Sequence, residues 1–150
     1  MSICGDGALK DSIDKEIVKM ELGGSITMGG VLDFATELVP VMKENADLFV
    51  CCHRQGDPSC TYLETMGCGV PIIGYNNDAF AGIVKYSNAG WITEMDNPKL
   101  LASQIAEISR NEPLLKERAF QSLRFAEQHT FEKTFDFRID HIHHTLARTQ

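Results

Sequence analysis

Short apolar runs alternate with amphipathic segments over the first two thirds of the chain. The runs at residues 2–4, 25–28, 48–52, 70–74 and 91–94 have the length of β-strands. The segments between them place apolar side chains at helical spacing, as in residues 8–21, where the series is Leu9, Ile13, Ile17 and Met20. This alternation predicts an α/β fold with a Rossmann-like parallel sheet flanked by helices.

A further helix is predicted over residues 32–43, with an inward face formed by Phe34, Leu38 and Val41. Pro40 falls within this segment. Proline lacks the amide hydrogen and its ring collides with the preceding turn, so we expect Pro40 to kink or shift the helix.

From residue 98 the apolar positions keep a helical spacing, which predicts a helical C-terminal tail. Asn97 before Pro98 is a helix start signal, and residues 111–113 (Asn-Glu-Pro) separate a first helix from a second. A third helix is expected from Thr130, with an apolar face formed by Phe131, Phe135, Ile139, Ile142 and Leu146. We expect this face to be partly unburied, which makes it a candidate contact with another domain or with a second copy of the chain.

Composition limits the class of protein. A chain of 150 residues with 43% hydrophobic and 23% charged residues is an ordinary globular sequence, long enough for a single core. Its formal net charge is -7 and its pI is near 5.1, so nucleic acid is excluded as a partner and docking on an anionic membrane is disfavoured.

The cysteines indicate a reducing compartment. The five cysteines are an odd number, and none forms a C-x-x-C pair of metal or redox spacing. Four of them lie in or beside the apolar runs and the helix of residues 46–75 and are expected to act as small hydrophobic residues. A cytoplasmic protein is therefore expected. The first residues lack the basic and long apolar regions of a signal peptide, and no apolar run approaches a membrane span.

The candidate chemistry lies between Ala46 and Tyr75, where the pattern is strand, loop, helix and strand. Asp57 before Pro58 is expected to begin the helix. The amides that follow point out of a positive helix end and form a potential phosphate site; they belong to Ser59, Cys60 and Thr61. Glu64 shares their face of the helix. One acid beside one anion site predicts a ligand with hydroxyls and phosphates.

Four motifs resemble the donor-binding, C-terminal domain of retaining glycosyltransferases of the GT-B fold, especially family 4. They are residues 46–50 (ADLFV), residues 63–72 (LETMGCGVPI), the turn Gly5-Asp6-Gly7, and residues 26–30 (ITMGG). The resemblance runs from about Ser2 to about Leu146, and the motif around Glu64 is its most specific part. It implies that residues 1–150 are one nucleotide-sugar-binding domain, an incomplete half of a GT-B fold.

The resemblance also implies an activity. The intact enzyme would transfer a sugar from a UDP- or GDP-sugar to a saccharide or lipid-linked acceptor, with retention and without a bound metal or cofactor. The commonest setting of such relatives is bacterial surface polysaccharide synthesis, of lipopolysaccharide, O-antigen or capsule. The parent enzyme would then be cytoplasmic or peripheral at the inner face of the membrane.

Roles for single residues follow from the resemblance. Glu64 would hold the ribose hydroxyls, and the amides of residues 59–61 would hold the diphosphate, with Tyr62 beside them. Gly5 and Gly7 would line the cleft, and the strand end at Met28 would receive a flat ring. For His53 two interpretations remain: it contacts the pyrophosphate or the transferred sugar, or it is a loop residue without a role in binding. The family's first acid corresponds to Gly56, so the neighbouring Asp57 either replaces it, as a catalytic partner of Glu64, or only caps the helix.

Other candidate sites and functions carry less support. His141, His143 and His144 are expected to lie on a solvated helix face and to bind no metal. A nucleophilic Cys60 with His53 has no orienting acid at a defined position. A nucleotide-sugar epimerase of similar fold and a non-enzymatic scaffold or regulatory remnant are the alternative functions.

The resemblance implies that segments of the intact enzyme precede this sequence. They are the acceptor-binding domain, the first strand of the donor-binding domain, and an Arg and a Lys that neutralise the donor phosphates. That strand would lie in the middle of the sheet, so its neighbours would meet, stay apart or pair with another chain. We therefore expect residues 1–150 alone to bind a nucleotide weakly without turnover, and to self-associate through a sheet edge or the C-terminal helix.

Overall fold

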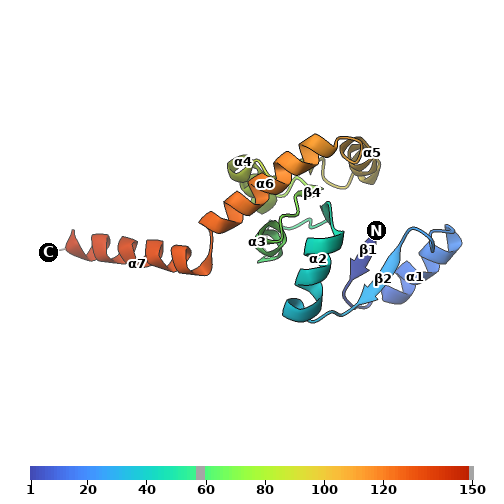
Figure 1. Cartoon of the computed structure of the whole chain (residues 1–150), viewed down its shortest axis with the longest axis horizontal. Helices are drawn as coiled ribbons and strands as arrows, with labels where there is room; N and C mark the ends of the chain where they lie inside the picture. The colour runs from blue at the N-terminus through green and yellow to red at the C-terminus, as the bar shows by residue number, and fades with distance from the viewer. Residues whose placement is uncertain (57–59, 149–150) are drawn as a thin grey trace. The chain divides into compact units, whose positions relative to one another are not determined.

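A computed structural model describes residues 1–56 and 60–148 (Figure 1). The chain divides into two compact units, Met1–Val41 and Met42–Gln150, and each is described by itself. Hydrogen bonds group the described strands into two parallel sheets, β1-β2 in the first unit and β3-β4-β5 in the second. The parallel α/β architecture that the sequence predicts is therefore confirmed.

The first unit contains β1 (Ser2–Cys4), α1 (Lys10–Lys19) and β2 (Thr27–Gly30). The two strands pair in parallel, with Ile3 opposite Met28 and a shift of register before Cys4. Among the described residues of this unit none is fully buried. The unit thus presents a strand–helix–strand motif whose apolar side chains are at most half-buried.

The helix predicted over residues 32–43 is divided into a π-helical turn and an α-helix. The turn η1 spans Phe34–Leu38 and α2 spans Val39–Asn45. In η1 the amide of Leu38 donates to the carbonyl of Asp33, five residues earlier, at 2.9 Å. Pro40 cannot donate to the preceding turn, and the wider turn accommodates this loss, which confirms the expected shift.

The inward face predicted for this segment is wrong for two of its residues. Phe34 is 50% exposed and Val41 is 37% exposed. The π turn inserts an extra residue into the helical repeat, so side chains spaced for a regular α-helix no longer share one face.

The second unit is a sheet covered on both sides. Its strands are β3 (Phe49–Cys51), β4 (Ile72–Tyr75) and β5 (Gly90–Thr93), with β4 in the centre. Ile72 packs in a core on one face with residues of α3 (Cys60–Gly67) and α4 (Asp78–Ser87) and against α6 (Glu112–Gln128). Ile73 packs on the opposite face with residues of α5 (Pro98–Ile108). Successive residues of β4 therefore pack into two hydrophobic cores, one on each face of the sheet.

Side-chain caps begin the helices of this unit at the positions that the sequence signals. Asn97 accepts a hydrogen bond from the amide of Leu100 at 3.0 Å, and Asn111 accepts from Leu114 at 3.2 Å. Thr130 accepts from the amide of Lys133 at the start of α7 (Phe131–Ala147). Each cap satisfies an amide that has no partner within its helix.

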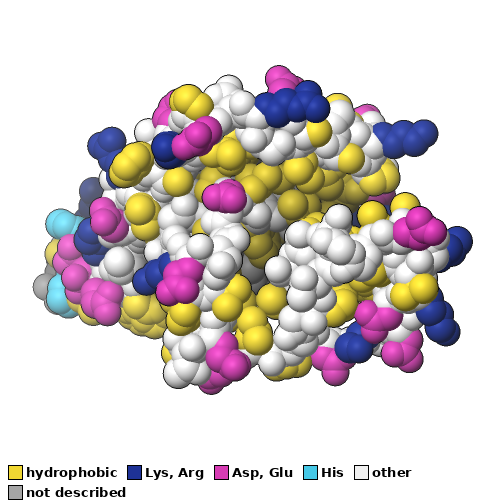
Figure 2. Space-filling view, turned by 45° about the vertical axis from the view of Figure 1, so that its right-hand side comes forward, with side chains coloured by type: hydrophobic (Ala, Val, Ile, Leu, Met, Phe, Trp, Pro, Cys, Tyr) yellow, Lys and Arg dark blue, Asp and Glu magenta, His cyan; other side chains and the backbone are white. Residues whose placement is uncertain are grey.

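The last helix, α7, continues beyond α6 as a separate rod (Figure 1). All of its residues are described and none is buried; Phe131 is 78% exposed. The expected unburied apolar face is thus present. Acidic and basic side chains are interspersed over the face of the molecule drawn in Figure 2. Within the described ranges, no helix has the length and apolar character needed to cross a membrane.

Candidate functional site

The first group of candidate residues lies at the carboxyl end of β3. The strand ends at the buried Cys51, and the chain emerges with Cys52, His53 and Arg54, all of which are exposed. Ligands of parallel α/β sheets bind beyond the carboxyl ends of the strands, so this is the expected edge for a site. Although Cys52 is exposed as a residue, partial burial of its thiol raises the thiol pKa, with the neighbouring Cys51 as a second cause.

His53 is held at its backbone and at its ring. The amide side chain of Asn77 donates from Nδ2 to the carbonyl oxygen of His53 at 3.0 Å, while Asn77 Oδ1 accepts from the amide of Phe80 at 2.9 Å. Asn77 is buried and caps α4. The hydroxyl oxygen of Tyr62 lies 3.4 Å from His53 Nδ1. The loop after β3 is therefore fixed by two different helices.

Tyr62 lies in the core, although the resemblance places it among the ligand-binding residues. Its side chain is fully buried, and its ring centroid lies 5.3 Å from that of Phe80. Only its hydroxyl reaches the site, where Cys51 Sγ donates to it at 3.6 Å. The apolar spacing of Tyr62 and Met66 on α3 was the signal in the sequence for this burial.

The start of α3 carries the predicted phosphate and ribose residues. Cys60, the first residue of α3, is exposed, Thr61 is half-buried, and Glu64 is exposed one turn later. Cys60 and Glu64 are four residues apart and share a face of the helix. Asp57 and Ser59 lie outside the described residues.

Gly56 fits closely against the start of α4. A Cβ atom built at Gly56 would lie 3.3 Å from Asp78 Cβ and 3.6 Å from the amide nitrogen of Asp78. This spacing is tighter than that of most real side-chain contacts, so an acid at position 56 would require its neighbours to shift. The packing therefore disfavours a side chain at the position of the family's first acid.

Arg54 forms an ion pair with Asp96, which follows β5. Its Nε lies 2.6 Å from Asp96 Oδ1, and both side chains are exposed. Asp96 adopts a left-handed backbone conformation with φ of 57° in the loop after β5. Of the two basic residues that follow β3, His53 is the one held by buried side chains.

The second group of candidate residues lines a cavity in the first unit, at the carboxyl ends of β1 and β2. The cavity has a volume of about 320 Å³, and its lining includes Gly5, Gly7 and Met28, the three residues predicted there. Gly5 has φ of 124°, a conformation that favours glycine, and its amide donates to the carbonyl of Gly30 at 2.6 Å.

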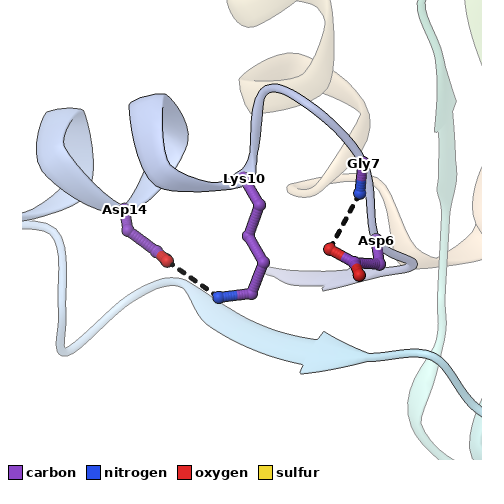
Figure 3. Close-up of polar contacts among 4 residues, drawn as sticks. All are labelled: Asp6, Gly7, Lys10 and Asp14. Carbon is purple, nitrogen blue, oxygen red and sulfur yellow. Dashed lines mark hydrogen bonds and ion pairs between the residues drawn. The ribbon is translucent and has the colours of Figure 1, made fainter.

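Two charged residues also line this cavity: Asp6, which lies within the turn of residues 5–7 that was expected to line the cleft, and Lys10, which was not predicted. Asp6 accepts a hydrogen bond from the amide of Gly7 at 2.8 Å, which closes the turn after β1 (Figure 3). Lys10 lies 3.1 Å from Asp14, and the hydrogen bond and charge of Asp14 raise the pKa of Lys10 (Figure 3). Both residues line the cavity with apolar walls from Ile3 and Ile13. The position of Lys10 at the first turn of α1 was the signal available in the sequence.

Within residues 1–56 and 60–148, no group of three or more His, Cys, Asp or Glu side chains could hold a metal ion.

Solved structures with the same fold include HepE, a sucrose-phosphate synthase and the glycosyltransferase WaaG. HepE from Anabaena in complex with UDP is 18% identical with a TM-score of 0.77, and the match covers 96% of this chain and 40% of that chain. Sucrose-phosphate synthase from Thermosynechococcus elongatus is 17% identical with a TM-score of 0.74, covering 99% and 38%. WaaG, a glycosyltransferase involved in lipopolysaccharide biosynthesis, is 15% identical with a TM-score of 0.72, covering 85% and 34%.

This chain spans about 40% of the length of these solved relatives. A comparison with curated proteins found no significant match. The family described as glycosyl transferases group 1 matches residues 1–122, which is most of the chain. The chain therefore belongs to the glycosyl transferases group 1 family, as its motifs indicated.

Proposed function

We propose that residues 1–150 form the donor-binding domain of a retaining glycosyltransferase and bind the nucleoside diphosphate of a UDP- or GDP-sugar. The observation that carries this proposal is the arrangement at the start of α3, where exposed Cys60 and Glu64 share a helix face beyond the carboxyl end of β3. HepE, which has the same fold, was solved with UDP and with UDP-glucose, and this supports the choice of ligand.

The residues at the start of α3 have complementary chemistry for such a ligand. The amides of Cys60 and Thr61, with Ser59 before them, carry the positive end of the helix dipole toward a diphosphate. This charge also stabilises the diphosphate as it leaves the sugar. Glu64 is one turn further along and accepts hydrogen bonds from the two ribose hydroxyls. Asp57 is assigned to the orientation of the transferred sugar.

The cavity of the first unit, taken by itself, is proposed to receive a flat ligand ring. A volume of about 320 Å³ falls at the small end of the range for ligand pockets. Gly5 and Gly7, which carry no side chain, and the half-buried Met28 line the cavity, and Asp6 and Lys10 add charged groups to its lining.

The transfer reaction is assigned to the intact enzyme. Because this chain spans about 40% of its solved relatives, residues 1–150 alone are expected to bind a donor without transferring its sugar. The acceptor is assigned as a saccharide or a lipid-linked saccharide of a cell-surface polysaccharide pathway in the cytoplasm. The involvement of WaaG in lipopolysaccharide biosynthesis supports this setting.

Nucleotide titration by calorimetry tests the proposal. UDP, GDP and ADP are titrated into the wild-type chain, Glu64→Ala and Glu117→Ala. Glu117 is an exposed glutamate within α6 and provides a matched control. One diphosphate is expected to bind, and Glu64→Ala is expected to weaken it about tenfold or more, because hydrogen bonds to a charged group contribute about 1.5–3 kcal/mol. No binding of any diphosphate, or equal losses in both variants, would contradict the donor site.

A further inference from the structure

We infer that Asn77 is a positioning residue for the donor site: its buried carboxamide holds the loop of residues 52–56 in the conformation that receives the diphosphate. The inference rests on the proposed function and deepens it. Asn77 lies between β4 and α4 and acts on the ligand only through this loop. The inference therefore assigns to Asn77 an effect on the affinity for a nucleoside diphosphate.

The loop of residues 52–56 borders the start of α3, where the diphosphate is proposed to bind. It leaves β3 at its carboxyl end, and Nδ1 of His53 lies 3.4 Å from the hydroxyl oxygen of Tyr62 in the first turn of α3. The centroids of the two rings are 6.0 Å apart. A shift of the loop would therefore change the position of His53 relative to this helix end.

Two polar contacts tie this loop to the segments that follow the other two strands of the sheet. All five residues of the loop are exposed, so its path is not set by side chains packed in the core. Asn77, after β4, donates from Nδ2 to the carbonyl oxygen of His53 at 3.0 Å. Asp96, after β5, is paired with Arg54. The two contacts differ in strength because they differ in burial.

The contact with Asn77 is the stronger of the two. Asn77 is 4% exposed, and its carboxamide is fixed at both ends, since Oδ1 accepts from the amide of Phe80 at 2.9 Å while Nδ2 donates to His53. A buried carboxamide bonded through both atoms keeps one orientation, so it holds the His53 carbonyl in one place. The side chains of Arg54 and Asp96 are 72% and 54% exposed, and exposed ion pairs contribute little.

A loop that is ordered in advance lowers the cost of ligand binding. A fixed loop loses little conformational freedom when the ligand arrives, whereas a released loop must be ordered at that moment. Because His53 is exposed, water can replace the carboxamide of Asn77 as the partner of its carbonyl once that side chain is shortened. Loss of this contact therefore frees the loop and weakens the ligand without unfolding the sheet.

The effect on the loop is tested by NMR of the free protein with ¹³C-carbonyl histidine and ¹⁵N-arginine labels. His53-Arg54 is the only His-Arg pair in the sequence, so a single carbonyl–amide correlation reports on the loop. Asn77→Ser keeps an oxygen that caps α4 but is one bond shorter. The His53 carbonyl is then expected to move upfield and the Arg54 amide to become more mobile.

Asn111→Ser is the matched control, because Asn111 caps α6 in the same way through the amide of Leu114. It is expected to leave the His53–Arg54 correlation unchanged. An unchanged correlation in Asn77→Ser, or the same change in both variants, overturns the inference.

The consequence for the ligand is tested by UDP titration of the same variants, under conditions in which urea unfolding shows each of them to be folded. Asn77→Ser is expected to weaken UDP binding about fivefold, because the released loop is ordered on binding, and Asn111→Ser is expected to leave it unchanged. Asp96→Asn removes the ion pair of Arg54 and is expected to weaken UDP binding by about twofold or less.

Equal UDP affinity in Asn77→Ser and the wild type, or a larger loss in Asp96→Asn than in Asn77→Ser, overturns the positioning role. Absence of UDP binding in the wild type overturns the proposed function and the effect of Asn77 on the ligand. The NMR experiment still decides in that case whether Asn77 holds the loop.

Discussion

Gly74 lies in the central strand β4, where the structure leaves no room for a side chain. A Cβ atom at this position would lie 2.6 Å from the carbonyl oxygen of Cys51 on the neighbouring strand and 3.1 Å from Phe80 Cε1. Ordinary contacts begin at 3.4 Å, so both strand β3 and the core of α4 would have to move. The substitution Gly74→Ala therefore strains the strand pair that leads to His53.

Overpacking of this kind typically costs about 1–3 kcal/mol and can cost more where backbone is involved. Because the closest atom belongs to the backbone of a paired strand, we expect Gly74→Ala to lower the free energy of unfolding by about 3 kcal/mol. Gly82 is the matched control. It lies within α4 with no heavy atom within 4 Å of an added Cβ, so Gly82→Ala is expected to stabilise the protein by about 0.5–1 kcal/mol.

Urea unfolding followed by the emission of Trp91 measures both effects. Trp91 is the single tryptophan of the chain and lies in β5 opposite Ile73 of β4, so it reports on this sheet. With a slope of about 2 kcal/mol/M, the midpoint is expected to fall by about 1.5 M for Gly74→Ala and to rise by about 0.25–0.5 M for Gly82→Ala. Midpoints that change in the same direction, or a Gly74→Ala midpoint equal to that of the wild type, would refute the packing argument.

Two further predictions concern hydrogen bonds at helix starts. Asn77→Ala removes the cap of α4 and the donor to the His53 carbonyl, so it should lower the free energy of unfolding in urea by about 2 kcal/mol. The control Asn111→Ala removes a cap alone and should lower it by about 1 kcal/mol. Equal losses in the two variants would show that the contact with His53 does not contribute. Hydrogen bonds from the side chain and then the amide of Thr36 lower the pKa of Asp33, so the stability that this carboxylate contributes is present above its usual pKa and is lost as the pH falls through the folded value. In a ¹³C NMR titration, Thr36→Val is expected to raise the pKa of Asp33 toward its usual value, and Thr134→Val, on α7, is expected to leave it unchanged.

The elements of this fold could be predicted because their signals are local. Each strand of the second unit is a short apolar run, and the caps at Asn97, Asn111 and Thr130 act within three residues of themselves. The effect of Pro40 was also local, since a missing amide disturbs only its own turn. Whether Pro40 would produce a kink or a π turn could not be predicted, because both accommodate the missing amide hydrogen. The surrounding structure decides between them.

The residues that hold the site together could not be found from the sequence. Asn77 reads as turn chemistry, yet its side chain bonds a carbonyl 24 residues away. Lys10 carries no signal of a cavity until β1 and β2 are paired. Contacts of this kind depend on the folded backbone, because no periodicity or short motif relates the two partners.

Tyr62 shows why the pattern of apolar residues and the resemblance to a family gave different roles for one side chain. The spacing on α3 places its ring in the core, and the motif places it at the donor site. Both are consistent with a ring that packs on Phe80 while its hydroxyl lies at the edge of the core, within reach of His53. The ring of Tyr62 therefore contributes to core packing, while its hydroxyl contacts the side chain of His53. Removal of the ring would open a cavity in the core, whereas removal of the hydroxyl alone would keep the ring packed on Phe80 and remove the contacts with Cys51 and His53.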